Sequence, residues 1–115
     1  MSDTPSKSST QRQVRVAELL RELAATFLAR ESNRTSLITV TYCDVAPNMR
    51  RATIFFTVLP VEKEKDAAAF VTRQLGAFRE YAMKKTRMKM LPFFDAKIDS
   101  GEKMRQKIDE LGLST

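Results

Sequence analysis

The chain has 115 residues, of which 43% are hydrophobic and 30% charged, and its formal net charge at pH 7 is +6. This length predicts a single domain, and no apolar run reaches the roughly 18 residues that a membrane-spanning helix needs. The absence of histidine and the single cysteine, Cys43, argue against a Cys–His nucleophile, a Cys/His zinc site and an internal disulfide. We therefore expect a non-enzymatic cytoplasmic protein without metal or cofactor.

Residues 1–11 are rich in Ser, Thr and Gln and contain no hydrophobic stretch. This composition predicts a disordered N-terminal segment and argues against a secretory signal. From Arg12 to Arg30, apolar residues recur at helical spacing, which predicts an amphipathic helix of about five turns. Its expected buried face consists of Val16, Leu19, Leu20, Leu23, Ala24, Phe27 and Leu28.

Two β-strands joined by a short turn are expected next. Residues 37–45 and 52–59 are rich in β-branched and aromatic side chains in an alternating pattern. Pro47 and Asn48 indicate a turn between them. Strands separated by so short a link are expected to pair as an antiparallel hairpin.

A second helical region is predicted after Pro60, with Asp66 as its N-cap. Gly76 lies inside this region, where glycine costs roughly 1 kcal/mol relative to alanine. The residue is compatible with a bend between two helices, with a close approach of the backbone, or with a tolerated helical glycine. The expected buried face consists of Phe70, Val71, Leu75, Phe78 and Ala82.

The last elements are a predicted third strand over residues 93–99 and a short helix over residues 102–111, followed by a frayed end at 112–115. Met104, Ile108 and Leu111 share one side of that helix. The expected order is α-β-β-α-(bend)-α-β-α, an α+β fold with too few strands for a parallel α/β architecture. We expect one compact domain over residues 12–111.

Several side chains in these elements have two interpretations. Alternation places Tyr42 on the same side of its strand as Val40, and makes Cys43 a half-buried, unreactive thiol. Phe55 is available for stacking against a nucleobase only if the helices leave its side of the sheet uncovered. The methionines of the basic segment favour packing between helix and third strand over an adaptable contact surface. These methionines are Met83, Met88 and Met90.

The excess positive charge is concentrated in one segment. Residues 73–90 contain six basic residues and one acidic residue, Glu80. This concentration favours a phosphate-binding surface over a merely solubilising run of charge. The six basic residues are Arg73, Arg79, Lys84, Lys85, Arg87 and Lys89.

The order of elements and several motifs together resemble the bacterial ribosome-binding factor A family over residues 12–111. The motifs open the first helix, form the strand–turn–strand stretch, mark the expected bend, and flank the third strand. In chain order they are Arg15-Val16-Ala17-Glu18, Val40-x₄-Val45-Ala46-Pro47-Asn48-Met49-x₂-Ala52-x-Ile54-x-Phe56-x-Val58, Gly76-x₂-Arg79, Arg87-x-Lys89-x₂-Pro92 and Asp99-Ser100.

The resemblance implies a KH-like domain of the second type, with an α-β-β-α-α-β order and a three-stranded sheet packed against helices. Ordinary KH modules hold nucleic acid with a Gly-x-x-Gly loop. The family has instead a helix–bend–helix around an Ala-x-Gly element. Here the corresponding residues are Gln74-Leu75-Gly76, so the alanine of that element is absent.

The resemblance also implies a function: binding to the immature small (30S) ribosomal subunit and its rRNA, and support of late 16S rRNA maturation. We expect a monomer that binds no membrane and no small-molecule substrate. The alternatives are a general single-stranded nucleic-acid-binding module and a basic protein–protein adaptor. Residues expected to contact RNA are the six basic residues of 73–90 together with Arg12, Arg15, Arg50 and Arg51.

Overall fold

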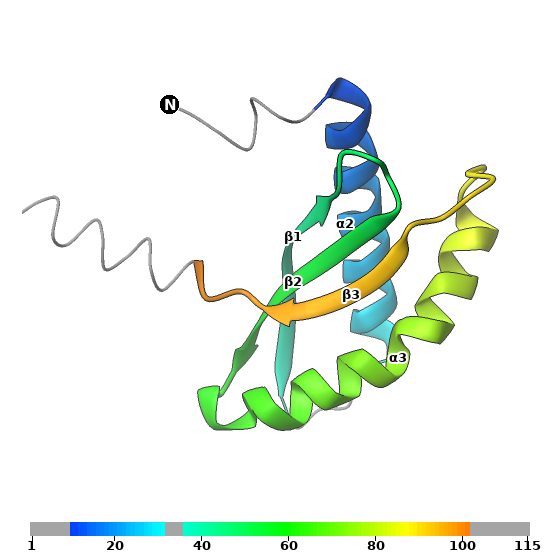
Figure 1. Cartoon of the computed structure of the whole chain (residues 1–115). Helices are drawn as coiled ribbons and strands as arrows, with labels where there is room; N and C mark the ends of the chain where they lie inside the picture. Colours follow the sequence, from blue (N-terminus) through cyan, green and yellow to red (C-terminus); the bar gives the residue numbers. More distant parts are fainter. Residues whose placement is uncertain (1–9, 32–35, 102–115) are drawn as a thin grey trace, which may run out of the picture.

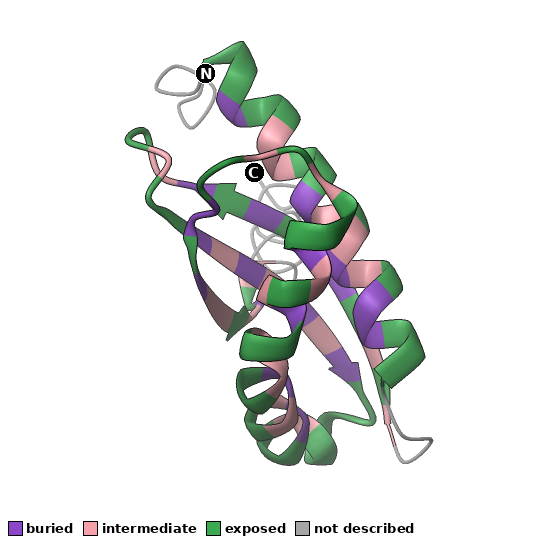
Figure 2. Cartoon of the chain, turned by 90° about the vertical axis from the view of Figure 1, so that its right-hand side faces the viewer, coloured by how far each residue is buried: buried purple, intermediate pink, exposed green. Residues whose placement is uncertain are grey.

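A computed structural model describes residues 10–31 and 36–101 of the chain. Two helices pack against one face of a three-stranded sheet (Figures 1 and 2), which confirms the expected α+β class. The elements are α2 (Gln11–Glu31), β1 (Leu37–Val45), β2 (Arg51–Leu59), the short 3-10 turn η1 (Val61–Lys63), α3 (Glu64–Lys85) and β3 (Phe93–Ile98).

The sheet has the order β1-β2-β3. β1 pairs with β2 in the antiparallel sense, as expected of a hairpin, and β3 pairs with β2 in the parallel sense. The predicted third strand is therefore confirmed, and α3 is the connection that parallel pairing requires. The expected helix over residues 102–111 and the end at 112–115 lie outside the described residues.

A bulge in β1 reverses the predicted side of Tyr42. The pairing shifts between Val40, which lies opposite Phe56, and Tyr42, which lies opposite Phe55. One extra residue in a strand turns every later side chain to the other face. Tyr42 is therefore on the face away from the helices, where its ring stacks on Phe55 with centroids 4.4 Å apart.

The same bulge turns Cys43 into the core, where it is buried rather than half-buried. Burial, assisted by the nearby Asp44 carboxylate, raises the pKa of the Cys43 thiol to about 12. A thiol with so high a pKa carries almost no thiolate at neutral pH, so the expectation of an unreactive cysteine agrees with its environment.

The start of α2 is fixed by a reciprocal cap that the sequence pattern of the apolar residues does not reveal. Gln13 donates its backbone N–H to Thr10 Oγ1 at 3.1 Å, and its Oε1 accepts the Thr10 backbone N–H at 2.9 Å. Its Nε2 also donates to the Val45 carbonyl at 3.0 Å, which connects the helix to the end of β1. Gln13 is consequently buried, whereas Leu19, which was expected in the core, is 37% exposed.

We expect Gln13→Ala to lower the free energy of unfolding by about 2 kcal/mol, because it removes half of the cap and leaves the buried Val45 carbonyl without its donor. Urea denaturation measures this difference. The control is Gln11→Ala, an exposed position in the same first turn. Equal stabilities of the two variants would show that the Gln13 contacts contribute nothing.

α3 begins at Glu64, directly after η1, so Asp66 lies within the first turn and is not the N-cap. The 3-10 turn supplies the carbonyl for the first helical donor, because the Glu64 N–H bonds to the Val61 carbonyl. The helix also runs unbroken through Gly76, so the two helices expected there are one. Glycine keeps its N–H and its cost of about 1 kcal/mol is small beside the packing of the helix.

Figure 1 shows that this single helix nevertheless changes direction partway along its length. Gly76 does not have a positive φ, and a Cβ built on it would meet nothing within 4 Å. Of the alternatives left open for Gly76, the close approach of another backbone segment is therefore excluded. A bend within one continuous helix replaces the helix–bend–helix arrangement.

The core lies between the inner face of the sheet and the two helices. Phe78 of α3 is 2% exposed and packs with Phe27 of α2 and Phe94 of β3, at ring-centroid distances of 5.6 and 4.9 Å. Phe56 in the central strand is fully buried beneath both helices' apolar faces. Among the described residues, no helix is long and apolar enough to cross a membrane.

Candidate nucleic-acid interface

Three segments that are distant in sequence place basic side chains toward one end of the molecule. The first turn of α2, the β1–β2 turn and the segment after α3 all lie in the upper part of Figure 1. The Phe93 backbone N–H donates to the Arg50 carbonyl at 2.8 Å, which holds the segment after α3 beside the β1–β2 turn. The exposed basic residues in these segments or directly beside them, including the last turn of α3 and the first residue of β2, are Arg12, Arg15, Arg50, Arg51, Lys84, Lys85, Arg87 and Lys89.

None of these eight side chains forms an ion pair with another part of the chain that the structure describes. Two of them lie over aromatic rings instead: Lys85 over Tyr81 at 5.7 Å, and Arg51 over Phe93 at 5.7 Å. The carboxylates of residues 10–31 and 36–101 therefore do not neutralise these charges. A polyanion approaching this end meets exposed cations.

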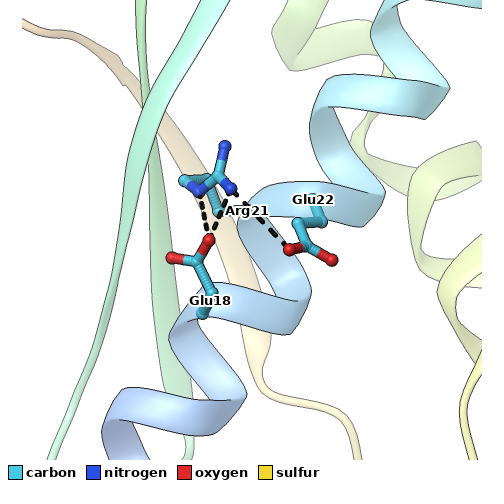
Figure 3. Close-up of polar contacts among 3 residues, drawn as sticks. All are labelled: Glu18, Arg21 and Glu22. Atoms are coloured by element: carbon cyan, nitrogen blue, oxygen red, sulfur yellow. Dashed lines mark hydrogen bonds and ion pairs between the residues drawn. The ribbon is translucent and has the colours of Figure 1, made fainter.

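Arg21, on the exposed side of α2, shows the opposite arrangement (Figure 3). Its Nε donates to Glu18 Oε2 at 3.0 Å, and its Nη2 lies 3.9 Å from the Glu22 carboxylate. The hydrogen bond from Arg21 holds the pKa of the Glu18 carboxyl below its usual value. Because its charge is already matched by two acids, Arg21 is not part of the cationic surface.

Arg79 differs from the other basic residues because its guanidinium is used within the fold. The side chain is half-buried, and it donates from Nη1 to the Pro92 carbonyl at 2.6 Å and from Nη2 to the Leu91 carbonyl at 3.4 Å. These bonds connect α3 to the segment that leads into β3. The residue therefore positions the neighbouring basic residues whether or not it also contacts a ligand.

We expect Arg79→Lys to lower the free energy of unfolding by about 1 kcal/mol, because an ammonium cannot reproduce the fork of donors that reaches both carbonyls. Thermal unfolding followed by circular dichroism measures the loss. Arg73→Lys, an exposed position on the same helix, is the matched control. An Arg79→Lys variant as stable as Arg73→Lys would contradict this role.

Arg73 is separated from the other basic residues. It lines a pocket with Ser36, Ile38, Lys63 and Asp66, formed where the start of α3 meets the start of β1. No residue of the β1–β2 turn or of the segment after α3 lines that pocket. The structure thus divides a charge cluster that is continuous in the sequence.

The interpretation of the methionines as core residues is wrong for two of the three. Met83 is 58% exposed and Met90 is 80% exposed, whereas Met88 packs partly against the core. Phe93 is likewise 66% exposed, although it opens a predicted strand. The sequence signal that was available is that Met90 directly follows Lys89 at the end of the basic segment, and that Phe93 directly follows Pro92. Among the described residues, no group of three or more acidic, cysteine or histidine side chains could hold a metal ion.

This fold and this surface define the class of the protein: a small α+β domain with a three-stranded sheet against two helices and an exposed cationic end. The model of the family described as ribosome-binding factor A matches residues 12–112, and the chain belongs to this family. Ribosome-binding factor A of Syntrophobacter fumaroxidans is 31% identical over 106 residues, covering 84% of this chain and 91% of the relative. The corresponding protein of Coxiella burnetii is 26% identical over 104 residues, covering 89% and 87%.

Solved structures of similar fold agree with this assignment. The crystal structure of ribosome-binding factor A from Thermus thermophilus superposes with a TM-score of 0.67 at 14% identity, covering 75% of this chain and 94% of that one. The solution structure of a putative ribosome binding factor A from Thermotoga maritima gives 0.66 at 18% identity, covering 77% and 88%. At these identities the likeness concerns the fold.

Proposed function

We propose that the chain binds the immature small (30S) ribosomal subunit through its rRNA and assists late maturation of 16S rRNA. It acts in the cytoplasm as a monomer, by binding alone, without catalysis or a cofactor. Two findings support this proposal: the chain belongs to the ribosome-binding factor A family, and one end of the fold carries exposed cations.

The proposal rests mainly on the exposure and the unpaired charge of three side chains, Lys84, Arg87 and Lys89, in the part of the chain that the structure describes. These side chains are exposed and form no ion pair within the described part of the chain. Phosphate contacts of this kind release counterions, so binding falls steeply as salt is raised. Contacts with phosphates fix the position and the orientation of a protein on RNA, but they do not distinguish one base from another. The surface therefore recognises the shape of folded rRNA more than its sequence.

Sedimentation of the tagged full-length chain with ribosomal particles from cell lysate tests the proposal. We expect the protein to migrate with free small subunits, and to be lost from them as the salt concentration increases. Migration only at the top of the gradient at low salt would contradict the proposal.

The two alternatives give different results in the same experiment. A general single-stranded nucleic-acid binder would bind arbitrary oligonucleotides as tightly as small subunits. A protein–protein adaptor would stay bound to its partner after treatment with ribonuclease. Either result would replace the ribosomal proposal.

A further inference from the structure

One face of the sheet is left uncovered by the part of the chain that the structure describes, because both helices lie on the other face (Figures 1 and 2). Strand pairing shows which side chains share this open face, since residues on either side of the buried Phe56 and Val58 point away from the helices. Three cross-strand pairs of β1 and β2 form what we call the open-face patch: Leu37 with Leu59, Thr39 with Thr57, and Tyr42 with Phe55.

The large apolar side chains of the open-face patch are in contact with solvent. Leu37 is 61% exposed, Leu59 is 59% exposed and Tyr42 is 42% exposed. Phe55 is half-buried, and its ring stacks on Tyr42. A single exposed leucine is ordinary, but a contiguous apolar patch on a small domain marks a surface that another element covers.

The described chain ends beside this patch. The Asp99 backbone N–H donates to the Phe56 carbonyl at 2.7 Å, so the chain leaves the sheet at the level of Phe55 and Thr57. Leu59 lies three residues further along β2, which is about 10 Å in a strand. The pairing of β3 with β2 ends at Phe56. The segment 102–115 therefore begins within a short distance of the open-face patch.

Asp99 is arranged as the cap of a helix that begins at this point. It is 2% exposed, and its Oδ1 accepts the Gly101 backbone N–H at 2.9 Å, which is the bond that an N-cap makes. Gly101 itself is helical. Asp99 Oδ2 is buried and has no hydrogen-bond partner among the described residues. The next backbone N–H of a helix that starts here, that of Glu102, is the donor such an oxygen needs.

The sequence that follows Gly101 carries one apolar stripe at helical spacing. Met104, Ile108 and Leu111 recur at i, i+4 and i+7, and Gln106 falls on the opposite side. A short helix of this kind is marginal in water unless its apolar stripe is packed against another surface. The stripe is about 11 Å long at the rise of an α-helix, and the patch is about 17 Å long between the levels of Leu37 and Tyr42.

We propose that residues 102–111 of the same chain dock as a helix on the open-face patch, with the apolar stripe against the exposed rings and leucines. The covalent connection at Gly101 holds the segment at a millimolar effective concentration, so modest apolar contacts are sufficient. This inference does not depend on the proposed function, because none of the basic residues assigned to the cationic end belongs to the patch.

The charges on this face favour the chain's own segment over RNA. The patch contains no basic residue, and the surrounding outward positions carry two acids and two bases: Asp44, Asp95, Arg51 and Lys97. A polyanion gains no net attraction from such a balance. The segment 102–111 has three acidic and three basic residues, so it is neutral as well. Phe55 does lie on an uncovered side of the sheet, as stacking on a nucleobase requires, but its ring is already stacked on Tyr42.

A second copy of the chain is the other possible occupant of the face. Association of two molecules loses translational and rotational freedom, whereas a segment tethered beside the patch loses much less. The intramolecular arrangement is therefore favoured at the same contact area.

Paramagnetic relaxation in the full-length, nitrogen-15-labelled chain tests the docking. A nitroxide is attached at Thr39→Cys, an exposed position within the patch. Cys43 stays unlabelled, because it is buried and the pKa of its thiol is about 12. We expect the amide signals of residues 104–111 to lose most of their intensity. The matched control is the same label at Thr26→Cys, exposed on α2 on the other side of the sheet, which should leave these signals intact.

Two variants of the segment, each combined with the Thr39→Cys label, show whether the apolar stripe makes the contact. Ile108→Ser removes the central side chain of the stripe, and we expect it to restore the signals of residues 104–111. Gln106→Ser changes the opposite side of the segment and should leave them broadened. Leu59→Ser, on the patch itself, should act like Ile108→Ser; because Leu59 is 59% exposed, the variant should still fold.

Full intensity of the 104–111 signals with the label at Thr39→Cys would overturn the proposal, and so would broadening that Ile108→Ser leaves unchanged. A mixture of unlabelled, nitroxide-bearing chains with isotope-labelled, nitroxide-free chains distinguishes a second copy. Broadening as strong in this mixture would show that another molecule covers the face. If octaribonucleotides shifted the Tyr42 and Phe55 signals while the segment stayed unbroadened, the face would bind RNA instead.

Discussion

The triple variant Lys84→Ala, Arg87→Ala, Lys89→Ala is expected to bind small ribosomal subunits on the order of 100-fold more weakly than the wild type. Each side chain is exposed and without an ion pair in the described residues, so each is available for a phosphate. Three charged contacts at about 1 kcal/mol each account for this loss. The slope of log affinity against log salt should also fall by about 3, as three counterions are no longer released.

Quantitative co-sedimentation at several salt concentrations measures both the loss and the slope. The matched control removes three exposed lysines away from this end, Lys63, Lys65 and Lys97, and so changes the net charge equally. If both triple variants lost affinity to the same degree, net charge rather than this surface would govern binding. The thermal stability of the triple variant should stay near that of the wild type, since none of the three side chains is buried.

The largest effect on stability is expected for Phe78→Ala, which should lower the free energy of unfolding by about 4 kcal/mol. Phe78 is 2% exposed and is the one ring of α3 that packs against both Phe27 of α2 and Phe94 of β3. Its removal opens a cavity where both helices meet the sheet, and such cavities cost about 3–5 kcal/mol for phenylalanine. This loss approaches the total stability of many small domains.

Urea denaturation at equilibrium measures the Phe78→Ala effect, and the slope m should stay unchanged if the transition remains two-state. Met83→Ala, 58% exposed on the same helix, is the control and should change the free energy of unfolding by less than about 0.5 kcal/mol. A loss below about 1 kcal/mol for Phe78→Ala would mean that the three rings do not form the centre of the core.

Local patterns in the sequence predicted α2 and the three strands, whereas α3 was expected as two helices. The alternation in residues 37–45 matches β1 at both ends, and the helical spacing from Arg12 to Arg30 matches α2 to within one residue at each end. A repeated apolar period reports which side of an element is buried, and that information is contained in neighbouring residues. The concentration of basic residues in 73–90 is equally local, and so it could be read directly from the chain.

The candidate site depends on contacts between distant segments, which local periodicity does not encode. The Arg79 guanidinium bonds to carbonyls 12 and 13 residues away, and so has a structural role that its charge alone does not indicate. The exposure of Met90 and Phe93 depends on where the segment after α3 meets the β1–β2 turn. Sequence reasoning assigned Met90 to the core because apolar residues are usually buried there.

By itself, then, the sequence determined α2, the three strands, the α+β class, the absence of histidine and the position of the basic segment, since each depends on residue type and short-range spacing. Only the tertiary structure decided which face each side chain occupies and which cations lie together. The bulge after Val40 turned Tyr42 outward and Cys43 inward, and parallel pairing of β3 with β2 placed Phe93 beside Arg51. These outcomes arise from strand register and packing across the whole domain, in which one inserted residue reverses a face.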